Sequence, residues 1–393
     1  MKDIQRKAPS ASRLQLIDGV RGYLLSAMFL AHVGIEMREL GSRSILRLAR
    51  HDRYLPVGDV DFFLFLSGFV TALAYLPSFT NGGIAGTGKA VLRRIRWLYL
   101  YQVGATMLLI LLVRLAGLQG VDLRAGDETT STWILLLQAM TFAVMPENLD
   151  ILMLYIVMMP FMPWVLKWLG EKRFWQLFAV LIALWTIAHL GLDVRVQAWL
   201  IGHGFDWRPY FSLMGHFNPL SYALLFYTGF AIGHAWSKEG PAVMTRIAPP
   251  RLALVAAAMA IVLIYAVGTR LLQRPPFWVQ APSELLTIHT ALNTVAVLYL
   301  FYWLLGTPHE KPAVIWLQKL VTGFFTLRFF VFLGRNGLFA YAIHVVIVAI
   351  LKHLVMTGEL ETSHGAILAL TATGLATIGV LTMLKRRWLP LAA

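Results

Sequence analysis

Long apolar segments recur along the whole chain, and they constrain its fold more than any other feature. Each is close to the about 20 residues that an α-helix needs to cross a bilayer. Of the 393 residues, 58% are hydrophobic and only 14% are charged. Backbone polar groups in lipid must be hydrogen bonded within the protein, which favours helices. The sequence therefore predicts an all-α, polytopic integral membrane protein, with one domain over residues 1–393 and a polar cavity within the helix bundle.

The distribution of lysine and arginine predicts ten crossings with both termini in the cytosol. Residues 133–145 are also apolar, but an eleventh crossing there would place the later basic loops outside. We therefore expect them to form a re-entrant or interfacial segment, and we expect 192–218 to form an outer cap loop. The predicted spans are 14–36, 57–77, 97–117, 149–168, 174–191, 219–236, 252–268, 288–305, 329–352 and 366–384.

The chain carries a net charge of +14 and has no cysteine. The missing cysteines exclude disulfides, thiolate metal ligands and a cysteine acyl-enzyme. The basic residues lie in short loops between apolar segments, where attraction to anionic membrane lipids explains them more simply than nucleic-acid binding.

The first apolar segment, Leu14 to Glu36, carries ionisable residues that a membrane helix rarely tolerates. Arg21 and His32 are eleven residues apart, which is about 16 Å along a helix axis. At about 100° per residue they project within roughly 20° of each other, with Asp18 on the same side. This stripe indicates a polar path across the membrane. The alternative is that Asp18 and Arg21 neutralise each other and His32 lies at headgroup level.

The spacing from Asp18 and Arg21 to His32 resembles the first helix of the membrane-bound acyltransferase superfamily, acyltransferase family three. Residues 61–69 resemble its second helix. Further segments are similar to the OpgC branch, which attaches succinyl groups to osmoregulated periplasmic glucans: 149–155, 217–220 and 334–337 leading to His344. The resemblance implies a bacterial cytoplasmic-membrane enzyme, succinyl-CoA as donor, a periplasmic glucan as acceptor and no tightly bound cofactor.

Several polar residues are predicted at one depth below the outer surface, on five different helices. We expect His32 to act as general base, because a neutral imidazole can take a proton from a hydroxyl. Either Asp61 or Asp150 would orient it, and Asn218, His344 or Ser67 would donate to the oxyanion. The predicted catalytic set is His32, Asp61, Asp150, Asn218 and His344, with direct acyl transfer.

A dense group of basic residues is predicted on the cytosolic side. Such charge can serve topology alone. Alternatively, it holds the phosphates of an acyl-CoA, whose pantetheine arm would run from Arg21 towards His32. The predicted donor-binding residues are Arg21, Lys89, Arg93, Arg94, Arg96 and Arg335.

One predicted outer loop, 37–56, breaks the charge rule with Arg43, Arg47 and Arg50 on one helical face. These arginines would either reach lipid phosphates or, together with His216, bind the acceptor. His203 and His216 lack the spacing of a zinc site, so no metal is expected.

Two other functions fit parts of this pattern. One is an O-acetyltransferase that acts on another exported polysaccharide or a lipid, with the same His32 chemistry. The other is an organic-anion transporter that uses the polar stripe, although the chain lacks the inverted halves typical of transporters.

Overall fold

The computed structural model describes residues 11–40, 57–121, 123–124, 130–146, 148–204, 217–271, 285–359 and 363–388. In these ranges the chain is almost entirely helical, apart from two-residue strands β1 (Leu123–Arg124) and β2 (Met145–Pro146), which pair antiparallel. The prediction of an all-α membrane protein is confirmed. The helices are α1 (Ala11–Glu39), α3 (Asp59–Ala116), α4 (Thr132–Met140), α5 (Asp150–Met158), η2 (Met159–Phe161), α6 (Met162–Gly170), α7 (Phe174–His189), α8 (Leu192–Gly202), α10 (Pro219–Glu239), α11 (Ala242–Ile247), α12 (Leu252–Leu271), α13 (Ile288–Gly306), α14 (Pro312–Phe325), α15 (Arg328–Arg335), α16 (Gly337–Met356) and α17 (His364–Trp388).

The number of crossings differs from the predicted ten. Among the described residues, 6 helices are long and apolar enough to cross a membrane, or up to 8 if each of two bent pairs forms one span. Part of the difference comes from α3, which joins two predicted spans in one helix of 58 residues. At about 1.5 Å per residue it would measure roughly 87 Å if straight, far more than the about 30 Å of a hydrocarbon core.

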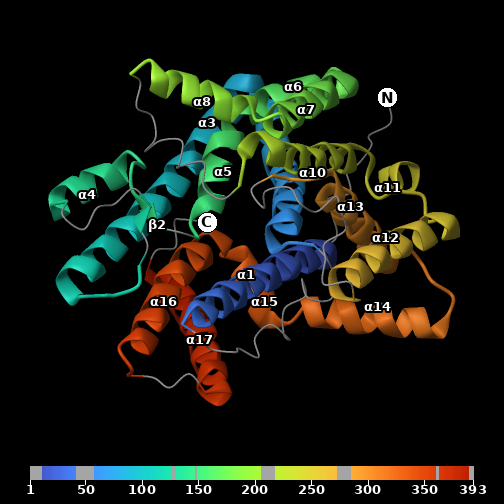
Figure 1. Cartoon of the computed structure of the whole chain (residues 1–393). Helices are drawn as coiled ribbons and strands as arrows, with labels where there is room; N and C mark the ends of the chain where they lie inside the picture. Colours follow the sequence, from blue (N-terminus) through green and yellow to red (C-terminus); the bar gives the residue numbers. More distant parts are fainter. Residues whose placement is uncertain are drawn as a thin grey trace.

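Helix α3 is not straight, because it breaks at Gly83 (Figure 1). Gly83 has φ 57° and ψ −147°, a backbone conformation that glycine adopts without steric cost. The break gives α3 two arms, and the predicted spans 57–77 and 97–117 fall on different arms.

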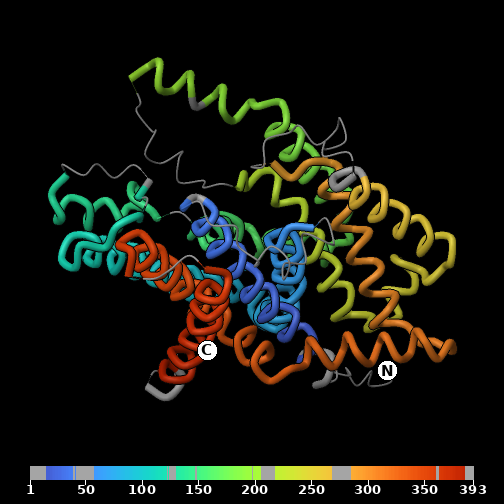
Figure 2. Tube along the Cα trace, turned by 60° about the horizontal axis from the view of Figure 1, so that its bottom comes forward, coloured from blue at the N-terminus to red at the C-terminus, as the bar shows by residue number. Residues whose placement is uncertain are grey.

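Several regions outside the predicted spans are helical, among them α4, α8, α11 and α14. α14 begins at Pro312 and occupies the predicted inner connection between spans 288–305 and 329–352, with exposed Trp316, Leu320 and Phe324. α8 occupies the start of the predicted cap loop and extends away from the packed helices in Figure 2. The nine-residue α4 rises only about 14 Å.

Helix α1 packs closely on α15 and α16 (Figure 1). An added Cβ at Gly334 would lie 1.8 Å from the carbonyl oxygen of Asp18, and one at Gly22 would lie 1.8 Å from that of Phe330. Only glycine permits this backbone contact. Small residues at helix interfaces allow such packing in membranes, where lipid is as apolar as leucine.

A second close contact joins the first arm of α3 to α10. An added Cβ at Gly229 would lie 2.1 Å from the carbonyl oxygen of Phe65, and one at Gly68 would lie 1.9 Å from that of Phe226. The two glycine contacts fix the separations of the helices that carry the polar residues described below.

We predict that Gly229→Ala destabilises the protein, because its methyl group must displace the backbone of α3. Overpacking of this kind costs typically about 1–3 kcal/mol. The measurement is the thermal midpoint in detergent. Gly104→Ala is the matched control, since nothing lies within 4 Å of its added Cβ. Equal midpoints for the two variants would contradict this packing.

The predicted topology places α8 in the periplasm and α11 in the cytosol. Arg195→Cys on α8 and Thr245→Cys on α11 introduce single exposed thiols into a chain that has none. A membrane-impermeant thiol reagent should label Arg195→Cys from outside intact cells and Thr245→Cys only after permeabilisation. Labelling of both from the same side would refute the predicted orientation.

Candidate functional site

The centre of the site is a histidine pair that joins α1 to α16. His32 Nδ1 lies 3.0 Å from His344 Nε2. The rings stack with centroids 5.1 Å apart and planes inclined by 21°. His344 is buried, whereas His32 is half-buried. The predicted meeting of these two residues, which lie far apart in the sequence, is therefore present in the structure.

The hydrogen bonds assign the proton positions in the neutral pair. His344 Nδ1 is hydrogen bonded to the backbone carbonyl of Tyr341, which can only accept. His344 Nε2 is then the acceptor, and His32 Nδ1 donates to it. This assignment makes Nε2 the basic nitrogen of His32.

Two ion pairs flank the histidines along the line where α1 meets α15 and α16, which we call the seam. Asp18 Oδ2 lies 3.1 Å from Arg335 Nε, and Glu36 pairs with Lys352. The residue numbers rise together on both sides of the seam, so α1 and α16 run parallel. The Asp18 carboxylate forms its ion pair with Arg335 and also lies close enough to Arg21 to interact with it electrostatically, so it does not neutralise Arg21 alone. Following the predicted orientation, we call the Asp18 end inner and the Glu36 end outer.

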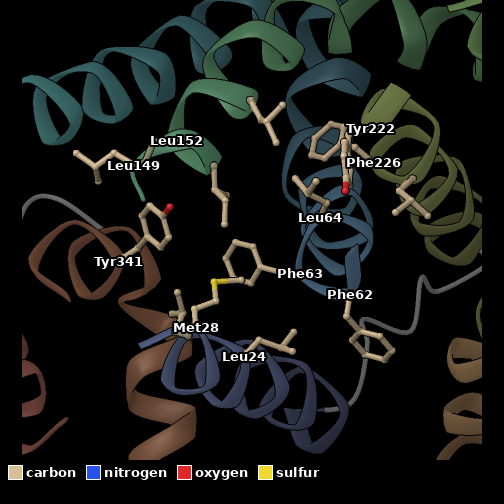
Figure 3. Packing of buried hydrophobic residues seen from close by; sticks show 14 of the residues in the cluster. Leu24, Met28, Phe62, Phe63, Leu64, Leu149, Leu152, Tyr222, Phe226 and Tyr341 are labelled. Atoms are coloured by element: carbon tan, nitrogen blue, oxygen red, sulfur yellow. The ribbon is translucent and has the colours of Figure 1, made fainter. Parts of the chain in front are cut away.

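The two predicted carboxylates lie in different surroundings. Asp150 is buried at the start of α5, close enough to Tyr341 to interact with it electrostatically. Tyr341 also donates a hydrogen bond of 2.5 Å from its hydroxyl to the carbonyl of Asn148. Figure 3 shows Tyr341 beside Leu149 and Leu152. Asp150 thus lies against the turn of α16 that precedes His344.

Asp61 is buried at the start of α3, where Oδ2 accepts a hydrogen bond of 3.1 Å from the backbone N–H of Gly58. Tyr222 of α10 is its side-chain neighbour. Tyr222 and Tyr341 lie on opposite sides of the view in Figure 3. The structure therefore associates Asp61 with α10 and Asp150 with α16.

Asn218 caps α10. Its Oδ1 accepts from the backbone N–H groups of Leu220 and Ser221, at 2.9 and 3.4 Å. Its Nδ2 donates to Asp193 Oδ2 at 2.6 Å. Asparagine is favoured at this position because it satisfies the first backbone donors of a helix. This geometry supports a structural role for Asn218 rather than the predicted role of oxyanion donor.

The predicted inner basic residues separate into two groups. Lys89, Arg93 and Arg96 are exposed, whereas Arg94 is half-buried. Arg94 lies close enough to Arg21, Tyr155 and Lys385 to interact electrostatically with each. Lys385 was overlooked as a site residue, because a basic C-terminal segment also serves topology.

Arg21 lies among buried polar atoms that are separate from the histidine pair. Its guanidinium carbon lies 5.8 Å from the centre of the Phe63 ring. Its Nε, Ser67 Oγ and the Tyr155 hydroxyl are buried, and Ser67 lies close enough to the Tyr155 hydroxyl to interact with it. These atoms come from α1, α3 and α5, and such groups are costly to leave unpaired.

The predicted acceptor-binding residues Arg43, Arg47, Arg50 and His216 lie outside the described residues. Within the described ranges, no group of three or more histidines and carboxylates is placed to hold a metal ion. His203 Nδ1 is hydrogen bonded to the backbone carbonyl of Trp199 at 2.8 Å.

The comparisons with known proteins bear on nearly the whole chain. No curated protein and no solved structure matches it. The family model described as OpgC protein matches residues 13–388. The matched region includes both histidines and all the buried cations described above. The chain therefore belongs to the OpgC protein family.

Proposed function

We propose that this chain transfers a succinyl group from cytosolic succinyl-CoA to hydroxyl groups of periplasmic glucans, in the bacterial cytoplasmic membrane with both termini in the cytosol. Membership of the OpgC family indicates a membrane acyltransferase that acts on glucans. The observation that carries the proposed mechanism is the hydrogen bond between His32 and His344.

In this mechanism His32 is the general base. Its Nε2 takes the proton from the acceptor hydroxyl while the hydroxyl oxygen attacks the thioester carbonyl. The tetrahedral intermediate then collapses, the carbon–sulfur bond breaks, and the leaving thiolate takes the proton back from His32. The products are a glucan ester and CoA with a free thiol.

His344 is the positioning residue for this base. It accepts from His32 Nδ1, so it fixes the ring and stabilises the imidazolium that forms when Nε2 is protonated. Its own Nδ1 proton is held by the Tyr341 carbonyl. Asp150 acts on His344 indirectly, through its interaction with Tyr341. This assignment gives His344 the orienting role that the sequence suggested for a carboxylate.

Arg21, Arg94 and Lys385 form a buried to half-buried cationic group at the inner end of the seam. Guanidinium groups bind phosphate oxygens in fixed geometry. The about 16 Å of helix between Arg21 and His32 then accommodates the pantetheine arm. Arg335 is paired with Asp18 and so contributes less charge to this group. Arg43, Arg47, Arg50 and His216 remain proposed as acceptor-binding residues.

His32→Ala should reduce transfer by at least about 100-fold, because general-base catalysis contributes typically 10²–10⁴-fold. Donor binding should change little, since the phosphate site lies at the other end of the seam. Transfer to isolated glucan and equilibrium binding of succinyl-CoA test the two statements. His203→Ala, on the exposed end of α8, is the matched control. Near wild-type transfer by His32→Ala would exclude His32 as the base.

Arg94→Gln should raise the KM for succinyl-CoA by about 10-fold or more, because a charge-assisted contact contributes about 1.5–3 kcal/mol. Lys89→Gln should change KM less than about threefold, since an exposed charge is screened by water and salt. The turnover number should be similar in both variants. Equal effects on KM would show that the inner residues act through net charge alone.

A further inference from the structure

Gln102 is a buried amide whose polar atoms have no partner in the described structure. Its side chain is 0% exposed, and neither Nε2 nor Oε1 makes a hydrogen bond there. It lies on the second arm of α3, on the same buried face as Leu98, Ala105 and Leu109. A glutamine in this position costs stability unless something pairs with it.

The depth of Gln102 along the seam follows from its neighbours. The adjacent Tyr101 places its ring 6.2 Å from that of Phe339 on α16. Phe339 precedes His344 by five residues, so it lies about 7 Å inward of the histidine pair. Further outward on the same arm, Leu109 lines a cavity of about 30 Å³ together with Glu36 and Lys352. Gln102 thus lies in depth between Arg21 and His32, near the level at which Lys385 Nζ lies 5.9 Å from the centre of the Phe339 ring.

This order of polar groups corresponds to the order of groups in an acyl-CoA. An extended chain advances about 1.2 Å per bond. The nearest amide of the pantetheine arm is roughly four bonds, or about 5 Å, from the thioester carbonyl. The nearest phosphate is roughly thirteen bonds, or about 15 Å, away. The corresponding spacings along the seam are about 7 Å to the depth of Gln102 and about 16 Å to Arg21.

We infer that Gln102 is a donor-binding residue that pairs with the cysteamine amide of the pantetheine arm. An amide both donates and accepts, as this glutamine requires. Met28 lies at about the same depth on α1 and packs against Phe63 in Figure 3. Its unbranched side chain adapts readily to a change of neighbours. The inference rests on the proposed function, because it identifies how that donor is held.

Two truncated donors test the pairing. The succinyl thioester of N-acetylcysteamine keeps only the nearest amide, and the succinyl thioester of pentanethiol replaces that amide with methylene groups. Release of thiol in the presence of isolated glucan gives kcat/KM for each donor. The full-length protein adds no thiol background, because it has no cysteine. Wild type should prefer the amide-containing donor by about 10-fold, the effect of about 1.4 kcal/mol.

Gln102→Met should reduce this preference to less than about twofold and raise the thermal midpoint without donor, because it removes an unpaired buried amide. Thr106→Val is the matched control: it is buried one turn away, and its hydroxyl bonds only its own helix, at the Gln102 carbonyl. It should keep the preference. A merely structural glutamine would instead lower the midpoint on substitution and leave the preference intact.

The outcomes distinguish a failure of the role of Gln102 from a failure of the proposed transferase function. Transfer from succinyl-CoA with no preference between the truncated donors in wild type overturns the role of Gln102, whatever happens to the variant. An unchanged preference in folded Gln102→Met overturns it as well. No thiol release from succinyl-CoA itself refutes the proposed transferase function, and the inference falls with it.

Discussion

The close contact of α1 with α15 and α16 is the constraint on which the site depends. Glycine at positions 22 and 334 lets the two backbones touch. That separation brings side chains on the facing helices within reach of one another, so that they form pairs across the contact. Polar groups in a membrane are stable only when they are paired or face a polar ligand. One close backbone contact therefore supports the ion pair at each end and the histidine pair between them.

The sequence predicted which helices and residues form this site better than it predicted which of these residues pair with one another. Periodicity and spacing located the apolar helices and the stripe of Asp18, Arg21 and His32. They could not pair Asp18 with Arg335, because such a contact depends on which helices become neighbours. The same limit applies to the ten predicted crossings. Apolar length identifies a segment, but the continuity of α3 through Gly83 is a backbone property that composition does not reveal.

The inner basic residues show how topology and chemistry share one segment. Any lysine or arginine beside a membrane helix helps to keep that end in the cytosol. Whether it also faces the bundle depends on its angle around the helix. Arg93 and Arg94 are adjacent, yet one is exposed and the other is half-buried beside Arg21. Composition alone treats these two arginines as equivalent.

The carbonyl of Tyr341 has a consequence for how the site can evolve. The group that fixes the His344 proton belongs to the main chain, so no substitution at position 341 removes it while α16 keeps its course. A carboxylate in the same role would be lost by a single base change. The backbone of α16 therefore sets which nitrogen of the base carries the proton, whereas the tyrosine ring is selected through its separate contacts with Asn148 and Asp150.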